Sequence, residues 1–153
     1  MKGTNQLRWS DAWLLAAIFQ SSKEKPADLV GILAAADFIH HAVPNLEELQ
    51  SGLFRLESAG LIHRPDSQQL GFQCTSAALA EIEPLLKKSK TAHQLWKELE
   101  ISLGAARWIP GEPVPHPANA HRYPGLTPVV YQKAVNDYLT QIRRCRKPSG
   151  RFL

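Results

Sequence analysis

The stretch from Pro44 to Thr75, PNLEELQSGLFRLESAGLIHRPDSQQLGFQCT, carries the clearest structural signals in the chain. Asn45 followed three residues later by Glu48 is typical of a capping box, which predicts that a helix begins here. The apolar positions then recur at helical spacing: Leu46, Leu49, Leu53, Leu56 and Ala59. Gly60 can adopt the left-handed backbone conformation that ends many helices. This part of the chain therefore predicts an amphipathic helix that ends just before Gly60.

Two short strands joined by a turn are predicted after this helix. Residues 61–64 form the first strand, and residues 70–75 alternate apolar and polar side chains as a half-buried strand does. Pro65 and Asp66 lie between the strands and favour a turn. A helix followed directly by such a hairpin is the order in which a winged helix-turn-helix builds its third helix and its wing.

Further helices are predicted on both sides of this stretch. Ser10 can cap a first helix and Asp28 a second, and apolar residues at helical spacing follow each of them. Ser76 and Thr91 can cap a fourth and a fifth helix, and Thr127 can begin a last one. The expected fold class is mainly α: a winged helix-turn-helix of three helices and a two-stranded wing, with additional C-terminal helices.

The chain of 153 residues divides into two predicted parts. Residues 8–90 form the winged-helix domain, and residues 91–153 form a possible dimerisation arm. This arm holds a helix, a Pro-rich crossing segment over residues 108–123, a C-terminal helix and a basic tail. With the C-terminal helix, four apolar side chains are the expected homodimer surface: Leu95, Trp96, Leu99 and Leu103. The alternative is that they pack within the chain against the last helix.

Composition narrows the class of protein. No run of about 18 apolar residues exists, and no continuous apolar signal region precedes residue 12, so a cytoplasmic protein is expected. Cys74 and Cys145 lie far apart and predict free thiols rather than a disulfide framework. The net charge is +4, yet residues 1–90 hold nine Lys and Arg against ten Asp and Glu. The basic surplus therefore belongs to the C-terminal end and not to the predicted winged helix.

Three phrases of the sequence resemble a group of uncharacterised bacterial winged-helix proteins. They are DAWLLAAI at residues 11–18, AAADFIHHAVPNLEEL at residues 34–49 and GLFRLESAGLI at residues 52–62. The last phrase is also similar to the recognition-helix end of MarR-like and PadR-like regulators, where L-x-x-x-G-L-I leads into the wing. The resemblance covers about residues 10–90. It implies DNA binding, and a dimer whose extra helices form the interface.

The expected partner is double-stranded DNA, with the protein acting as a bacterial transcriptional regulator. Gln50, Ser51 and Arg55 face outward on the predicted third helix, where Gln can pair with adenine and Arg with guanine or phosphate. Three further arginines are the expected phosphate contacts: Arg64, Arg143 and Arg144.

A rival hypothesis follows from the acidic residues of the same region. Glu47 and Glu48 lie in the first turn of the predicted third helix, and Asp66 lies at the tip of the wing. DNA would repel these charges, because its affinity for proteins comes mostly from phosphate neutralisation. The alternative function is a protein-protein interaction module without DNA binding, whose acidic third helix binds a basic partner.

Catalysis, metals and cofactors have no support in the sequence. No Gly-rich phosphate loop, nucleophile elbow or zinc-protease helix occurs, so the protein is not expected to be an enzyme. His40 and His41 are adjacent and point about 100° apart on a helix, which disfavours a shared metal ion. His116 and His121 have no Cys or acidic pair nearby at a recognised spacing. Cys74 is expected to be a buried, inert thiol.

Overall fold

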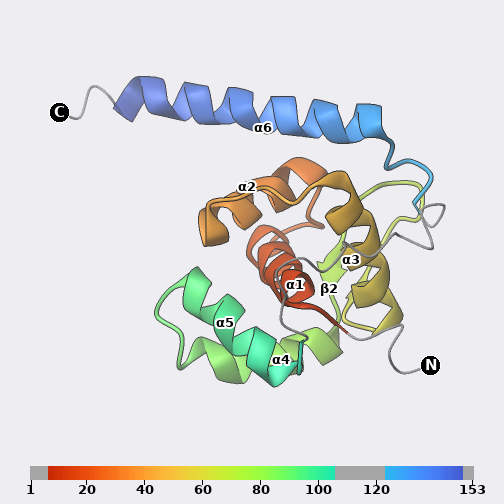
Figure 1. Ribbon diagram of the computed structural model, residues 1–153, viewed down its shortest axis with the longest axis vertical. Helices are drawn as coiled ribbons and strands as arrows, with labels where there is room; N and C mark the ends of the chain where they lie inside the picture. Colours follow the sequence, from red (N-terminus) through yellow and green to blue (C-terminus); the bar gives the residue numbers. More distant parts are fainter. Residues whose placement is uncertain (1–6, 106–122, 150–153) are drawn as a thin grey trace, which may run out of the picture.

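The computed structural model describes residues 7–105 and 123–149, with side chains up to residue 144 (Figure 1). This part of the chain is mainly α-helical, with one small β-hairpin after the third helix. The elements are α1 (Trp9–Ser21), α2 (Leu29–His40), α3 (Leu46–Ser58), β1 (Ile62–His63), β2 (Gln73–Cys74), α4 (Ser76–Leu86), α5 (Ala92–Ser102) and α6 (Pro128–Ser149). Within the described ranges no helix is long and apolar enough to cross a membrane.

The hairpin forms at the predicted place and pairs with the turn that precedes α2. β1 and β2 are antiparallel, with Ile62 opposite Cys74. An isolated antiparallel bridge joins Ala27 to Phe72, through hydrogen bonds of 2.8 and 2.9 Å between their backbone groups. The bridge fixes the start of α2 to the hairpin that follows α3.

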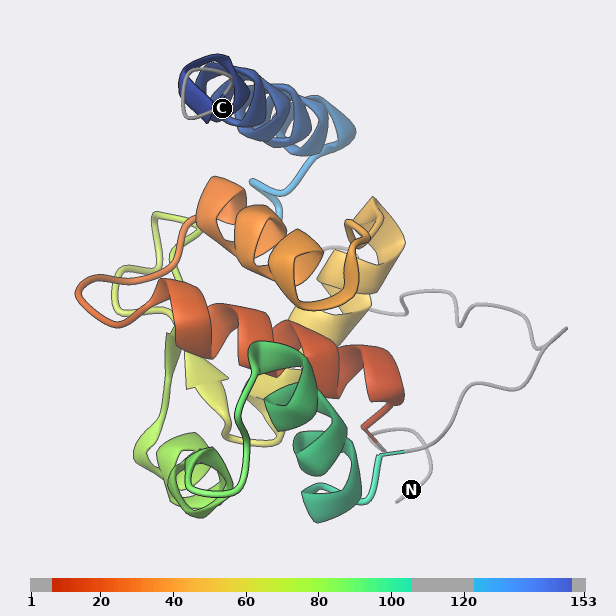
Figure 2. The ribbon, with the colours of Figure 1, turned by 90° about the vertical axis from the view of Figure 1, so that its left-hand side faces the viewer.

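Helix α1 lies at the centre of the fold. Every residue from 12 to 18 is buried, as expected for a helix that is apolar on all sides. Figure 2 shows α1 between α2 on one side and α5 on the other. The indole nitrogen of Trp13 donates to the carbonyl of Ala36 at 3.0 Å, which ties α1 to α2.

Most of the predicted helix ends are confirmed. Asn45 and Glu48 form the reciprocal capping box of α3, with hydrogen bonds of 2.8 and 2.9 Å. Asp28 caps α2 and Thr91 caps α5. Gly60 follows α3 with a positive φ of 75°.

Two predicted caps were wrong by one or two residues. α1 begins at Trp9 rather than after Ser10, because the Asp11 carboxylate accepts a hydrogen bond from the backbone nitrogen of Arg8 at 2.8 Å. Thr75, and not Ser76, caps α4, since its hydroxyl accepts from the backbone nitrogen of Ala78.

The side chains predicted as a dimer surface occupy a different place. Leu95, Trp96 and Leu99 are buried in the single chain, where α5 packs mainly against α1 and α4. Leu103 is half-buried against the same core. These contacts lie within the chain, as the alternative held, but they are made mainly with α1 and α4 rather than with the last helix.

Helix α6 lies across the outer side of α2 and extends past it toward the C-terminus (Figure 1). Thr127 caps it through a hydrogen bond from the backbone nitrogen of Val130, as predicted. The hydroxyl of Tyr138 donates to the carboxylate of Asp37 and so joins α6 to α2. Most of the predicted Pro-rich segment, residues 106–122, lies outside the described residues.

Candidate functional site

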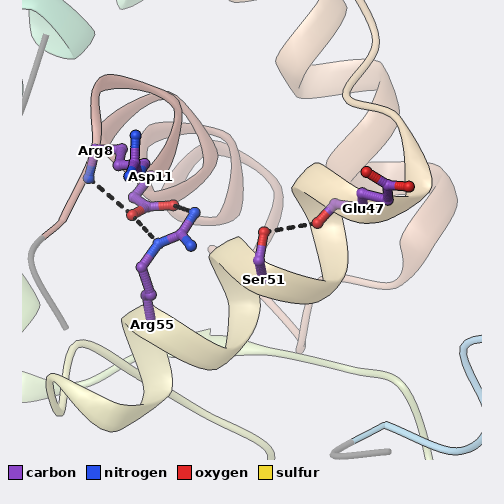
Figure 3. Close-up of polar contacts among 5 residues, drawn as sticks. All are labelled: Arg8, Asp11, Glu47, Ser51 and Arg55. Carbon is purple, nitrogen blue, oxygen red and sulfur yellow. Dashed lines mark hydrogen bonds and ion pairs between the residues drawn. The ribbon is translucent and has the colours of Figure 1, made fainter. Parts of the chain in front are cut away.

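The candidate site is the surface of α3, because sequence analysis placed the groove-contacting residues there. Arg55 of α3 turns inward and pairs with Asp11 at the start of α1 (Figure 3). Its Nε lies 2.6 Å from Asp11 Oδ2, and its Nη2 lies 3.0 Å from Oδ1. The exposed fractions are 11% for the Arg55 side chain and 1% for that of Asp11. In this conformation the guanidinium binds α3 to α1 and does not point into solvent.

The energetics of this pair follow from its burial. Burial raises the pKa of the Asp11 carboxyl, while the hydrogen bonds and positive charge of Arg55 oppose the shift. A buried carboxylate is strongly unfavourable unless it is paired and hydrogen-bonded. Arg55 therefore supplies the partner that lets Asp11 stay charged inside the fold.

Gly52 lies about one helical turn from Arg55, where α3 packs against Leu14 and Asp11 of α1. A Cβ atom at this position would lie 2.8 Å from Cδ2 of Leu14 and 3.1 Å from Oδ1 of Asp11. The absence of a side chain thus serves helix-helix packing.

The neighbouring polar residues of α3 are also engaged within the chain. Ser51 is 8% exposed, and its hydroxyl donates to the backbone carbonyl of Glu47 at 2.7 Å (Figure 3). The side-chain amide of Gln50 donates to the carbonyl of Leu126 at 3.0 Å. Together with Arg55, the three predicted groove residues therefore all make contacts inside this chain.

A short segment before α6, residues 123–126, fills the space between α3 and the hairpin. Tyr123 and Leu126 are 1% and 2% exposed. The Tyr123 hydroxyl donates to Oε1 of Glu57 on α3 at 2.6 Å, and its ring meets the ring of Phe72 edge-on at 5.7 Å. We call residues 123–126 the covering segment, because they contact both α3 and Phe72 beside β2.

Arg64 belongs to the same arrangement. It follows β1, and its guanidinium carbon lies 5.1 Å from the centre of the Tyr123 ring. Its Nη1 donates weakly to the carbonyl of Ser67 at 3.3 Å. The arginine predicted to contact phosphate thus packs on the covering segment.

The start of α6 is fixed beside the start of α3. The hydroxyl of Tyr131 donates to the carbonyl of Pro44 at 2.8 Å. Burial and the nearby negative charge of Glu48 raise the pKa of Tyr131. These contacts hold the covering segment at its downstream end, while Tyr123 holds the upstream end.

The two remaining predicted phosphate contacts lie elsewhere. Arg143 and Arg144 are exposed on the C-terminal half of α6. Figure 1 shows that this half of the helix points away from α3. The six predicted DNA-contacting residues are therefore not gathered on one face.

The described residues offer little support for a metal site or a reactive thiol. No group of three or more His, Cys, Asp or Glu side chains in residues 7–105 and 123–144 could hold a metal ion. His116 and His121 lie outside the described ranges. Burial raises the pKa of the Cys74 thiol to about 12, so this group stays protonated at neutral pH.

Comparison with known proteins assigns no family to the chain, which matches no protein-family model, no curated protein and no solved structure.

Asp11 and Tyr123 are partners of α3 that were not predicted from the sequence. For Asp11 a signal existed, because an acid in the first turn of a helix apolar on all sides must find a partner. For Tyr123 no local signal existed, since it lies 66 residues from Glu57.

Proposed function

We propose that this protein is a winged-helix interaction module, which binds a protein partner rather than DNA. Three helices, the hairpin and the Ala27–Phe72 bridge follow the order expected of a winged helix. One observation carries the choice of partner: on the outer face of α3, which such proteins insert into DNA, Gln50 and Glu57 are bound by Leu126 and Tyr123 of the same chain.

The charges around α3 support the same proposal. Glu47 is exposed in the first turn of α3, and Glu48 and Glu57 are half-buried on it. The one arginine of α3 is paired with Asp11. Proteins bind DNA largely by neutralising phosphates, so a surface of this charge is unfavourable for DNA.

A basic segment of another protein is the partner that fits this surface. The exposed carboxylate of Glu47 and the half-buried carboxylate of Glu48 both lie at the start of α3. The start of α6 lies alongside, because the hydroxyl of Tyr131 donates to the carbonyl of Pro44, the residue that precedes the N-cap of α3. Two neighbouring carboxylates at the start of a helix suit a partner segment that carries Lys or Arg.

DNA binding as a transcriptional regulator is the second candidate, and the order of helices and hairpin favours it. On this view the covering segment must leave α3 before DNA can enter. The exposed Arg143 and Arg144 would then add contacts to phosphates that do not depend on base sequence.

Fluorescence anisotropy separates the two candidates. Full-length protein and a truncation after Ile142 are titrated with random duplex DNA across a salt series. The interaction proposal expects no tight binding by either protein even at low salt. Tight binding with a steep salt slope that survives the truncation would favour the regulator. Binding that is lost with the truncation would mark the tail as a non-specific anchor.

A second titration tests the proposed surface. The probe is a synthetic peptide that alternates lysine and leucine, and the variant is Glu47→Gln. Binding to this peptide should weaken in the variant and remain unchanged in Glu83→Gln, which removes an exposed acid from α4. If peptide binding weakens equally in both variants, the effect comes from the net charge of the protein, and the assignment of the surface is wrong.

A further inference from the structure

A cavity of about 760 Å³ lies on another part of the molecule, between the start of α1, the end of α2 and the last turns of α5. Its lining includes Trp9, His40, Trp96, Lys97, Glu100 and Ile101. None of these residues takes part in the contacts of α3 described above. The cavity is therefore independent of the proposed protein-binding surface.

Aromatic rings form a continuous wall of this cavity. The ring centres of Trp9 and Trp96 are 6.0 Å apart, and that of His40 lies 4.5 Å from Trp96 and 6.2 Å from Trp9. The indole nitrogen of Trp96 donates to the backbone carbonyl of Trp9 at 3.2 Å. This hydrogen bond orients the Trp96 ring, which is buried behind the half-buried Trp9.

The charges at the rim of the cavity cancel. Lys97 Nζ lies 3.1 Å from Oε1 of Glu100 and 4.2 Å from the centre of the Trp96 ring. Burial, then the charge of Lys97 and the neighbouring His93 and His41, lower the pKa of His40, and Glu100 opposes them. His40 is therefore neutral near pH 7, and the lining residues carry no net charge.

The imidazole of His40 remains available for hydrogen bonding. It is half-buried and forms no hydrogen bond with the residues that the structure describes. A neutral imidazole offers one donor and one acceptor. Next to it Ile101 is 73% exposed and Trp9 is only half-buried, so apolar surface is left open to solvent.

We propose that this cavity binds an uncharged, planar aromatic molecule of one or two fused rings that carries a polar atom on its edge. The flat ring packs against the half-buried ring of Trp9, which favours a stacked or edge-on aromatic neighbour, and against the exposed side chain of Ile101. The polar atom hydrogen-bonds to His40. Aromatic lining together with a polar group that can orient the ligand is typical of small-molecule sites.

Protein NMR with three probes of one scaffold tests this proposal. Full-length protein is titrated with neutral indole, anionic indole-3-acetate and cationic tryptamine. Indole should shift the indole N–H signal of Trp9 and the ring signals of His40, and both charged probes should bind more weakly. The absence of shifts with indole up to its solubility limit would overturn the proposal, as would equal or tighter binding of tryptamine.

Variants locate the site and test its charge balance. His40→Ala should weaken indole binding by about tenfold, the effect of one lost hydrogen bond. Phe38→Ala removes an exposed aromatic ring outside the cavity and should leave binding unchanged. Glu100→Gln leaves Lys97 without its counter-charge and should shift the preference toward indole-3-acetate. If Phe38→Ala weakens binding as much as His40→Ala, or if Glu100→Gln leaves the preference unchanged, the assignment is wrong.

Discussion

The body of the molecule, α1 to α5, and the C-terminal part, residues 123–149, are held in place in different ways. The body shares one apolar core in which α1 is buried on all sides. The described C-terminal part contributes four buried side chains, namely Tyr123, Leu126, Ala134 and Tyr138. It depends more on single hydrogen bonds, made by the hydroxyls of Tyr123, Tyr131 and Tyr138.

This difference suggests that the apolar core of the body folds the protein, whereas the tyrosine hydrogen bonds hold the covering segment on α3. A net hydrogen bond stabilises a folded protein by about 1 kcal/mol, whereas a fully buried large apolar side chain contributes about 1.5–3 kcal/mol. Loss of the body core should therefore unfold the chain. Loss of one tyrosine contact should loosen the covering segment and leave the body folded.

The largest effect is expected from Arg55→Ala, inside the body. The substitution leaves the buried carboxylate of Asp11 without its partner and should lower the free energy of unfolding by about 3–5 kcal/mol. Urea unfolding followed by circular dichroism measures this change. Lys133→Ala is the matched control, because it breaks an ion pair with Asp137 on the exposed side of α6 and should cost less than about 1 kcal/mol. Similar losses in both variants would mean that the Asp11 pair contributes no more than a surface pair.

A pair of glycines compares the two regions directly. Gly52→Ala should destabilise the protein by about 1–3 kcal/mol, because the added methyl group meets Leu14 at 2.8 Å. Gly125→Ala, in the covering segment, meets only Leu70 at 3.9 Å and should be neutral or slightly stabilising. Thermal unfolding of both variants gives the comparison, and a stable Gly52→Ala variant would argue against the close approach of α3 to α1.

A smaller and local effect is expected from Tyr123→Phe. The variant loses the hydroxyl that donates to Glu57, which should cost about 1–2 kcal/mol. Hydrogen exchange read by mass spectrometry should show faster exchange in the start of α6, with α1 unchanged. Uniformly faster exchange across α1 and α6 would show instead that the covering segment belongs to the body.

The smallest effect is the pH dependence of the stability of the body, which His40 should influence. The pKa of His40 is lower in the folded chain than its ordinary value of 6.5, so the unfolded chain binds the proton more readily. Stability should therefore fall as the pH drops below about 6.5. His40→Gln should reduce this dependence when unfolding is measured between pH 8 and pH 5.5. An unchanged slope would assign the pH dependence to other groups.

Local features of the fold could be predicted from the sequence, and contacts between distant residues could not. The capping box at Asn45, the stop at Gly60 and the hairpin each depend on residues close in the chain, and all three are confirmed. Arg55 was assigned to the outer face of α3, because helical spacing alone does not tell which polar side chain has a buried partner. That partner, Asp11, lies 44 residues earlier.

The contacts of the covering segment were even harder to predict from the sequence. The Pro-rich composition between residues 108 and 123 gave no indication that Tyr123 would reach Glu57 or that Leu126 would meet Gln50. Such contacts depend on where the chain returns after a long connection. The surroundings of two predicted DNA-contacting residues, Gln50 and Arg64, thus depend on a segment whose position the sequence did not reveal.

The measurement that tests the central claim most directly is hydroxyl-radical labelling of the full-length protein, read residue by residue by mass spectrometry. Phe38, which is 76% exposed, serves as the internal reference for an accessible aromatic ring. If the covering segment packs on α3 in solution, Tyr123 should be labelled far more slowly than Phe38. Labelling of Tyr123 as fast as Phe38 would mean that α3 is open, and would contradict the proposal that this face is closed to DNA.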